Sequence, residues 1–219
     1  FNKDLLVGLL SSLDYSDFGK HLIPYSIDRY DVYGWIFNDY WEDIGTIRAF
    51  YETNLQLTED KPNFNFYDPR YPIYTYNTTM PITTVDNTVI QKALISKGCK
   101  IRAARIEHSI VGLRSSIDSG TEIKDTIIMG VDDDVFEKSS TDKKYFNIPL
   151  GIGKNCFIEK AIIDKNARIG DNVIIRPFPD DAEFDDPDPI KKYYVRDGIV
   201  IIPKNTVIKA GTVIEPASK

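Results

Sequence analysis

A near six-residue spacing of aliphatic side chains restricts the fold of this 219-residue chain more than any other feature. From position 89 onward, Val or Ile recurs every five or six residues, except across two polar segments. The series comprises Val89, Ile95, Ile101, Ile106, Val111, Ile117, Ile123, Ile152, Ile158, Ile163, Ile169, Ile175, Ile202, Ile208 and Ile214. Hexapeptide repeats of this type are typical of a parallel β-helix, in which each hexad supplies a short strand and a corner.

In such a fold, three hexads form one triangular coil of ~18 residues, and each aliphatic side chain stacks inward on its equivalent one coil away. We therefore expect a β-helix over residues 89–219. The side chains expected to point inward include Ile117, Ile123, Ile158, Ile163, Ile169 and Ile208. A sandwich of unrelated short strands is the alternative, but it gives no reason for a six-residue period over so many repeats.

Two segments interrupt the repeat. Residues 131–147 are polar and charged, and residues 176–194 are acidic and rich in proline. Both are expected to leave the prism at its corners as loops. An open prism end exposes apolar side chains and unpaired strand edges, so loops, the N-terminal segment or another subunit should cover it.

The N-terminal part of the chain has a different pattern, which favours helices and a strand. The expected elements are a helix over 2–10 capped by Asn2, a short helix capped by Ser16 or Asp17, a strand over 30–37 and a helix over 46–57. Residues 58–88 contain four prolines within 62–81 and are expected to form an extended connector.

Composition limits the partners of the chain. It has 27 basic and 33 acidic residues, a net charge of −6, which disfavours nucleic-acid binding. No apolar run approaches the ~20 residues that span a bilayer, so we expect no membrane partner. The two cysteines and two histidines lack the spacing of a zinc site. A local basic pocket remains compatible with binding of an anion.

Several motifs carry a family resemblance. They include NDYWEDIGTIRAFYETNL at 38–55, EHSIVGLRSSIDSG at 107–120, PLGIGKN at 149–155, IIDKNARIGDNV at 162–173 and DGIVIIPKNTVI at 197–208. In this order they resemble the ADP-glucose pyrophosphorylases, or glucose-1-phosphate adenylyltransferases, of plants and cyanobacteria. The resemblance extends over essentially the whole chain.

The resemblance implies a fold and a reaction. Members have a doubly wound α/β nucleotidyltransferase domain followed by a left-handed parallel β-helix. They make ADP-glucose and pyrophosphate from ATP and glucose 1-phosphate, with Mg²⁺. By this comparison, residues 1–57 are the C-terminal part of the first domain, 58–88 the connector and 89–219 the β-helix. The family's glycine-rich loop of the GGxGTRL kind does not occur in this sequence, so we expect no turnover by the 219-residue chain alone.

The resemblance places the catalytic candidates before the helix at 46–57. Asp43 of WEDIGT matches an aspartate that holds the metal ion near the sugar phosphate, and Glu42 stands beside it as a substrate-binding candidate. A carboxylate suits Mg²⁺, which prefers oxygen ligands. The structural alternative for Asp43 is a cap of the helix that begins near Thr46.

The resemblance also implies regulation by phosphorylated effectors such as 3-phosphoglycerate. Lys165 and Lys204 match the activator lysines, and Arg168 is a third candidate. Flexible ammonium groups suit a phosphate dianion, although all three residues would also be ordinary as exposed corner charges. The lysines are expected about two coils apart. Residues 76–86 lack the basic residue that the family usually has there, which favours weaker effector binding.

Two alternatives to a catalytic polypeptide remain open. One is a non-catalytic regulatory or assembly subunit of the same enzyme, since members assemble as homo- or heterotetramers. The other is a hexapeptide acyltransferase, for which His108 would be the base. The WEDIGT motif argues against the acyltransferase, and a lone histidine in a coil is more often a packed or corner residue. The expected location is the plastid for a plant protein and the cytoplasm for a bacterial one.

Overall fold

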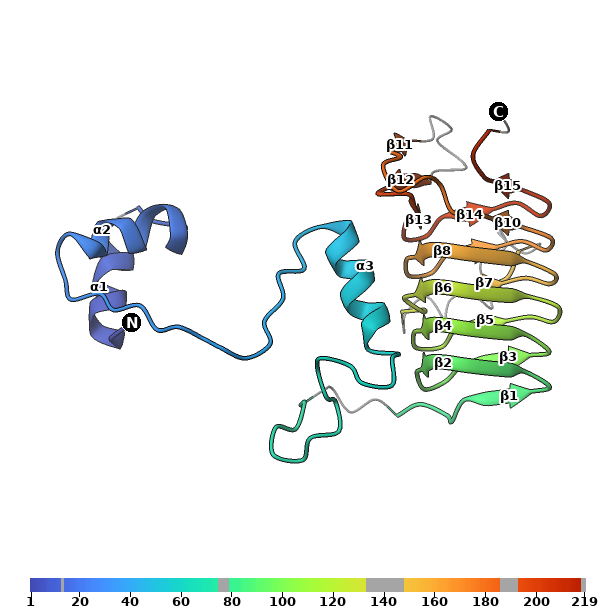
Figure 1. Cartoon of the computed structure of the whole chain (residues 1–219), viewed down its shortest axis with the longest axis horizontal. Coiled ribbons are helices and arrows are strands. Elements are labelled where there is room, and N and C mark those ends of the chain that lie inside the picture. The colour runs from blue at the N-terminus through green and yellow to red at the C-terminus, as the bar shows by residue number, and fades with distance from the viewer. Residues whose placement is uncertain (13, 75–78, 133–147, 186–192, 218–219) are drawn as a thin grey trace. The chain divides into compact units, whose positions relative to one another are not determined.

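The computed structural model describes residues 1–12, 14–74, 79–132, 148–185 and 193–217 (Figure 1). These residues form two compact units that divide between Asp39 and Tyr40. The helix expected to close the first domain belongs to the second unit in this structure. The domain division at residues 57 and 88 stays a prediction.

The first unit contains three short helical elements: α1 (Lys3–Ser12), the π-helix η1 (Phe18–Leu22) and α2 (Ile23–Ile27). Asn2 caps α1 as predicted, because its Oδ1 accepts hydrogen bonds from the backbone N–H groups of Asp4 and Leu5 at 3.0 and 3.2 Å. Asp17 caps η1 in the same way through the N–H of Lys20, at 2.7 Å. The sequence therefore located both helix starts.

The strand predicted over 30–37 is not formed. These residues carry no strand pairing, and Tyr33, Trp35 and Ile36 are 88%, 84% and 79% exposed. Aromatic and β-branched residues favour strands only where a neighbouring strand and a packing surface exist. Neither accompanies residues 30–37 within the described part of the first unit.

The second unit is built around a β-helix, whose stacked strands are visible in Figure 1. The strands are β1 (Thr84–Asp86), β2 (Val89–Ile95), β3 (Lys100–Arg102), β4 (Arg105–Val111), β5 (Ser116–Ile117), β6 (Glu122–Ile128), β7 (Gly151–Ile152), β8 (Phe157–Ile163), β9 (Arg168–Ile169), β10 (Ile174–Ile175), β11 (Phe184–Asp185), β12 (Tyr194–Arg196), β13 (Ile199–Ile202), β14 (Val207–Ile208) and β15 (Val213–Ile214). One sheet has the order β1-β3-β5-β7-β9-β14, and another has the order β11-β12-β13-β8-β6-β4-β2. The short strand β10 pairs with β8 and β15. Apart from the antiparallel pairs that β12 makes with β11 and β13, the pairing is parallel.

The core of the prism consists of stacked aliphatic side chains, as the hexad pattern predicted. One stack follows the pairing Ile101–Ile117–Ile152–Ile169–Ile208, and another follows Ile106–Ile123–Ile158–Ile175–Ile214. All six isoleucines that we expected to point inward are at most 2% exposed. Their burial confirms the hexad interpretation.

The pattern was wrong at the first coil. Val89 is 51% exposed, and its neighbour Ile90 pairs with the buried Ile106 instead. Strand pairing begins at β1, before residue 89, because Thr84 already pairs with Lys100. Five-residue steps also shorten the coils, so that equivalent residues such as Ile101 and Ile117 lie sixteen positions apart.

The second insert is more than a loop. Its strands β11 and β12 form an antiparallel pair, and β12 continues the sheet beyond β13. In Figure 1 these strands lie at the end of the stack that holds the C-terminus. The insert thus supplies part of the expected cover for the last coils. Most of the first insert, residues 133–147, lies outside the described residues.

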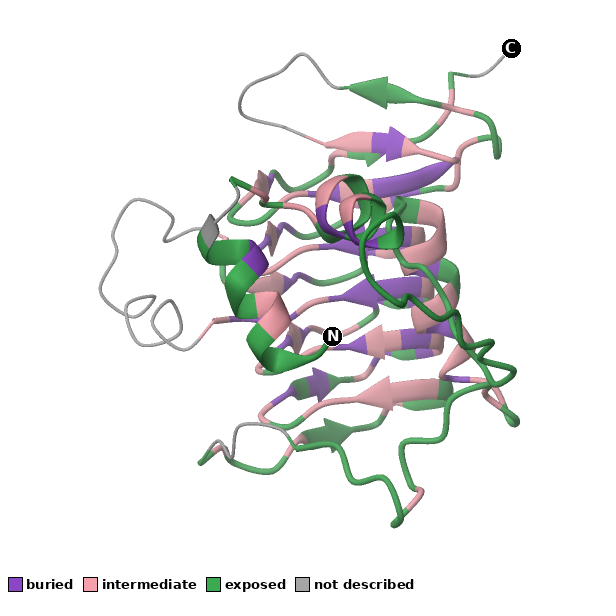
Figure 2. Ribbon diagram, turned by 90° about the vertical axis from the view of Figure 1, so that its left-hand side faces the viewer, coloured by how far each residue is buried: buried purple, intermediate pink, exposed green. Residues whose placement is uncertain are grey.

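Helix α3 (Ile47–Gln56) lies beside the outside of the β-helix in Figure 1. Figure 2 shows that buried residues gather on the stacked strands. The buried Tyr51 and Leu55 of α3 pack on the outward-facing side chains of Ile127, Ile162 and Ile199. The helix therefore belongs to the same packed body as the coils and fixes the loop that precedes it at one end.

Candidate effector site and substrate loop

Lys165 and Lys204 occupy the same corner of the prism in consecutive coils. The N–H of Asn205 donates to the carbonyl of Lys165 at 3.0 Å, and the N–H of Asn166 donates to Gly130 one coil earlier, also at 3.0 Å. The lysines are therefore one coil apart, and the expected separation of two coils is wrong. The second insert leaves the prism between them and adds sequence length without adding a full coil.

The two lysine side chains converge on one carboxylate. Lys165 Nζ lies 2.9 Å from Asp132 Oδ1, and Lys204 Nζ lies 2.6 Å from Asp132 Oδ2. Asp132 follows directly on the corner at Gly130, where the first insert begins. The coil stacking thus brings two ammonium groups and one carboxylate together from three separate stretches of sequence.

One buried amide group supports this carboxylate. Asn166 is 3% exposed; its Nδ2 donates to Asp132 Oδ2 at 3.2 Å and to Asn205 Oδ1 at 3.1 Å. Its Oδ1 in turn accepts a hydrogen bond from the backbone N–H of Asp132, at 2.9 Å. The amide therefore holds the backbone and the side chain of Asp132 in place.

The electrostatics of this corner favour an anion. The ammonium group of Lys204, followed by that of Lys165, holds the pKa of Asp132 far below its ordinary value. Two ammonium donors directed at a pair of oxygen atoms form the arrangement that a phosphate group also requires.

Arg168 has a different environment from the two lysines. It lies on β9, and its Nη1 donates to the carbonyl of Ile148 at 2.8 Å. The structure therefore joins two of the three effector candidates through Asp132 and shows Arg168 in contact with the segment that follows the first insert.

Asp43 and Glu42 lie on an exposed loop before α3. The helix cap is Thr46, whose Oγ1 accepts a hydrogen bond from the N–H of Ala49 at 3.1 Å. Asp43 instead accepts a hydrogen bond from Gly45 N–H within the loop, also at 3.1 Å. The capping alternative for Asp43 is thus excluded, and its carboxylate lies at the surface. Glu42 lines a shallow polar pocket with Arg48 and Glu52.

The loop fits Mg²⁺ as a partial site. Asp43 offers one exposed carboxylate, and Mg²⁺ is commonly bound through one or two carboxylates together with substrate phosphates and water. Within the described ranges, no group of three His, Cys, Asp or Glu side chains is placed to hold a metal ion. Asp43 could therefore supply one ligand of a metal ion that substrate phosphates and water also coordinate.

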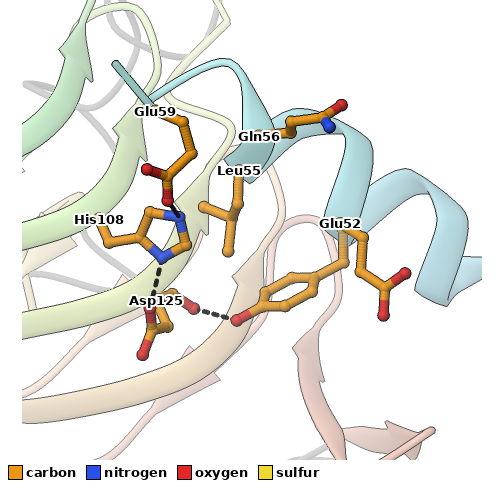
Figure 3. A pocket seen from close by; sticks show the side chains of 7 residues that line it. Glu52, Leu55, Gln56, Glu59, His108 and Asp125 are labelled. Atoms are coloured by element: carbon orange, nitrogen blue, oxygen red, sulfur yellow. Dashed lines mark hydrogen bonds and ion pairs between the residues drawn. The ribbon is translucent and has the colours of Figure 1, made fainter. Parts of the chain in front are cut away.

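His108 belongs to a charged cluster beneath α3 that the sequence did not reveal (Figure 3). Its Nδ1 lies 2.5 Å from Asp125 Oδ1, and its Nε2 lies 3.3 Å from Glu59 Oε1. Lys92 also contacts Glu59, at 2.7 Å, and holds the pKa of that carboxyl below its ordinary value. His108 is a corner residue with φ of 42°, as expected, but its partners come from positions that no local pattern connects.

The stacked parallel strands define a β-helix protein, and comparisons with known families add the class of the N-terminal part. The family described as the GLGC left-handed parallel β-helix domain matches residues 78–213, and the nucleotidyl transferase family matches residues 1–60. The chain belongs to the ADP-glucose pyrophosphorylase, or glucose-1-phosphate adenylyltransferase, family. These matches confirm the predicted fold class, including the left hand of the β-helix.

One relative illustrates the family relationship. The chain is 42% identical, over 98% of its length, to the chloroplastic/amyloplastic glucose-1-phosphate adenylyltransferase large subunit 1 of Zea mays. It spans 42% of the length of that relative. Among the helices of the described ranges, none is both long and apolar enough to cross a membrane.

Proposed function

We propose that this chain is part of a glucose-1-phosphate adenylyltransferase polypeptide whose β-helix binds a phosphorylated effector at Lys165 and Lys204. The observation that carries the proposal is the convergence of both ammonium groups on the two oxygens of Asp132, at 2.9 and 2.6 Å. A site that already holds a carboxylate has the donors and the charge for a phosphate. Each charge-assisted hydrogen bond contributes on the order of 1.5–3 kcal/mol.

In the proposed reaction, ATP and glucose 1-phosphate give ADP-glucose and pyrophosphate. Mg²⁺ would neutralise charge on the phosphates, with Asp43 as one of its protein ligands and Glu42 near the substrate. The exposed position of the loop before α3 supports this role. Nucleotidyl transfer also needs groups that cradle the triphosphate, so the 219-residue chain alone should not make ADP-glucose above background.

The effector proposal has a direct test. We expect isothermal titration calorimetry to detect 3-phosphoglycerate binding to the chain, and Lys165→Ala or Lys204→Ala should weaken it about tenfold or more, given the value of each charged contact. Lys209→Ala is the matched control, because Lys209 is an exposed lysine of the last coils. If both lysine variants bind 3-phosphoglycerate as tightly as the wild type, Lys165 and Lys204 are exposed corner charges without an effector role.

A non-catalytic regulatory subunit of the same enzyme is the second candidate. The relative from Zea mays is by name a large subunit. This name supports the proposal that the present chain is also part of a subunit of a larger assembly. In either case we propose a homo- or heterotetramer, and a plastid location if the source is a plant. Activity of the assembled enzyme separates the two: Asp43→Asn should lower turnover if this polypeptide is catalytic and leave it unchanged if it is regulatory.

A further inference from the structure

Asp132 occupies the place in which the proposed effector would be bound. Its two carboxylate oxygens take one lysine each, Lys165 on Oδ1 and Lys204 on Oδ2. An incoming phosphate needs these same ammonium groups. The side chain of Asp132 and a bound phosphate therefore compete for the same donors.

We propose that Asp132 is an internal competitor that keeps the lysine corner closed to weakly bound anions and sets the effector concentration at which the site fills. This inference rests on the proposed effector site. The cost of binding is the exchange of one carboxylate for one phosphate, because a phosphate placed between the two ammonium groups would take the position that the carboxylate of Asp132 occupies. A dianion gains more from the pair of positive charges than a carboxylate monoanion does, so a phosphate ester can displace Asp132 where a monoanion cannot.

The surrounding structure makes Asp132 an effective competitor. Asn166 is buried and holds both the N–H and the carboxylate of Asp132, at 2.9 and 3.2 Å. Val131, the preceding residue, is 5% exposed, and its N–H donates to Leu113 at 2.8 Å. An anion that is fixed in place loses little conformational entropy when it pairs with the lysines, so its effective local concentration is high.

Charge at the corner also depends on Asp132. With the carboxylate present, the two lysines and Asp132 have a combined charge of +1, and its replacement by an amide raises this charge to +2. Asp132→Asn keeps the size of the side chain. It removes the charge that competes with an effector and increases the attraction for a phosphate.

The test measures inorganic phosphate binding to the whole chain by calorimetry at constant ionic strength, because surface charge interactions vary with salt. Asp132→Asn should bind phosphate about tenfold more tightly than the wild type, as expected from the release of charge-assisted contacts. The matched control is Asp118→Asn. Asp118 lies elsewhere on the prism, pairs with Arg102 at 3.4 Å and has a similarly covered side chain, so its replacement should leave phosphate affinity unchanged.

The outcomes distinguish a failure of the internal competitor from a failure of the effector site. Equal or weaker phosphate binding by Asp132→Asn would overturn the internal competitor but leave the lysine site intact, provided that Lys165→Ala still weakens phosphate binding. Absence of lysine-dependent phosphate binding in both proteins would overturn the effector site and this inference together. Asp132→Ala, checked for folding by circular dichroism, serves as a second variant and should show the same gain in affinity.

Discussion

The hydroxyl of Tyr51 on α3 donates a hydrogen bond to the backbone carbonyl of Asp125 on β6, with an O···O distance of 2.5 Å. Burial, aided by the nearby charge of Asp125, raises the pKa of Tyr51 and keeps its hydroxyl protonated. This bond joins α3 to the β-helix across 74 positions of sequence. Because the loop that carries Asp43 ends at α3, the bond also helps to fix one end of that loop.

Loss of the Tyr51 hydroxyl should loosen this attachment. Tyr51→Phe keeps the ring packed on Ile127 and Ile162 but leaves the Asp125 carbonyl without its donor. We expect a loss of about 1 kcal/mol in the free energy of unfolding, measured by urea denaturation, as is typical for one hydrogen bond. Tyr67→Phe is the control, since Tyr67 is 85% exposed. Equal stability of the two variants would mean that α3 is held by apolar packing alone.

Core substitutions should distinguish the inward stacks from residues that merely follow the same spacing. Ile158 is fully buried in the second stack, so Ile158→Ala should cost about 2–5 kcal/mol of unfolding free energy. Val89 belongs to the same spacing but is 51% exposed, and Val89→Ala should change stability by less than about 0.5 kcal/mol. A large effect at Val89 would contradict the strand register described here.

One glycine of the EHSIVG motif is required by close contact between coils. A Cβ atom at Gly112 would lie 2.5 Å from the backbone of Met129 on the next coil. Gly112→Ala should therefore destabilise the β-helix by at least about 1–3 kcal/mol, the usual cost of overpacking. Gly8 in α1 has open space around its Cβ position, and Gly8→Ala should stabilise that helix slightly. Thermal unfolding should show a lower unfolding temperature for Gly112→Ala and a slightly higher one for Gly8→Ala.

Asp132 should make stability depend on pH in the acidic range. Lys204 and Lys165 hold its pKa below that of the unfolded chain, so the unfolded state binds the proton more readily. Its contribution is complete above the unfolded pKa of about 4 and is lost progressively as the pH falls below that value. Urea denaturation between neutral and acidic pH should show a smaller acid loss in Asp132→Asn than in the wild type. The same acid loss in both proteins would contradict the strong pairing with the lysines.

The periodic part of the fold was predictable because each hexad carries its own signal. Ile117 and Ile123 lie six positions apart, as do Ile152 and Ile158, and the parallel stacking of Ile123 on Ile158 follows from that repeat. Strand pairing already includes Thr84, before the first residue of the repeat, and the half-exposed Val85 of this end coil gives a weak pattern. The strand predicted over 30–37 failed because side-chain preference cannot supply a pairing partner.

The site was only partly predictable for a related reason. The motifs singled out Lys165 and Lys204 as candidates, but nothing local indicated that an insert residue, Asp132, would lie between their ammonium groups. The contacts of His108 with Glu59 and Asp125 were missed for the same reason, because no local pattern connects these positions. Contacts of this kind depend on how coils and inserts stack, which a single sequence read locally does not specify.

Nuclear magnetic resonance of the lysine ammonium groups shows whether a phosphorylated effector binds at Lys165 and Lys204. The signals of Lys165 and Lys204 are assigned by their loss in Lys165→Ala and Lys204→Ala, and the chain is then titrated with 3-phosphoglycerate. The effector proposal predicts that both signals shift along one saturation curve while that of the exposed Lys209 changes little. If 3-phosphoglycerate moves other lysine signals and leaves Lys165 and Lys204 in place, the effector does not bind at this corner.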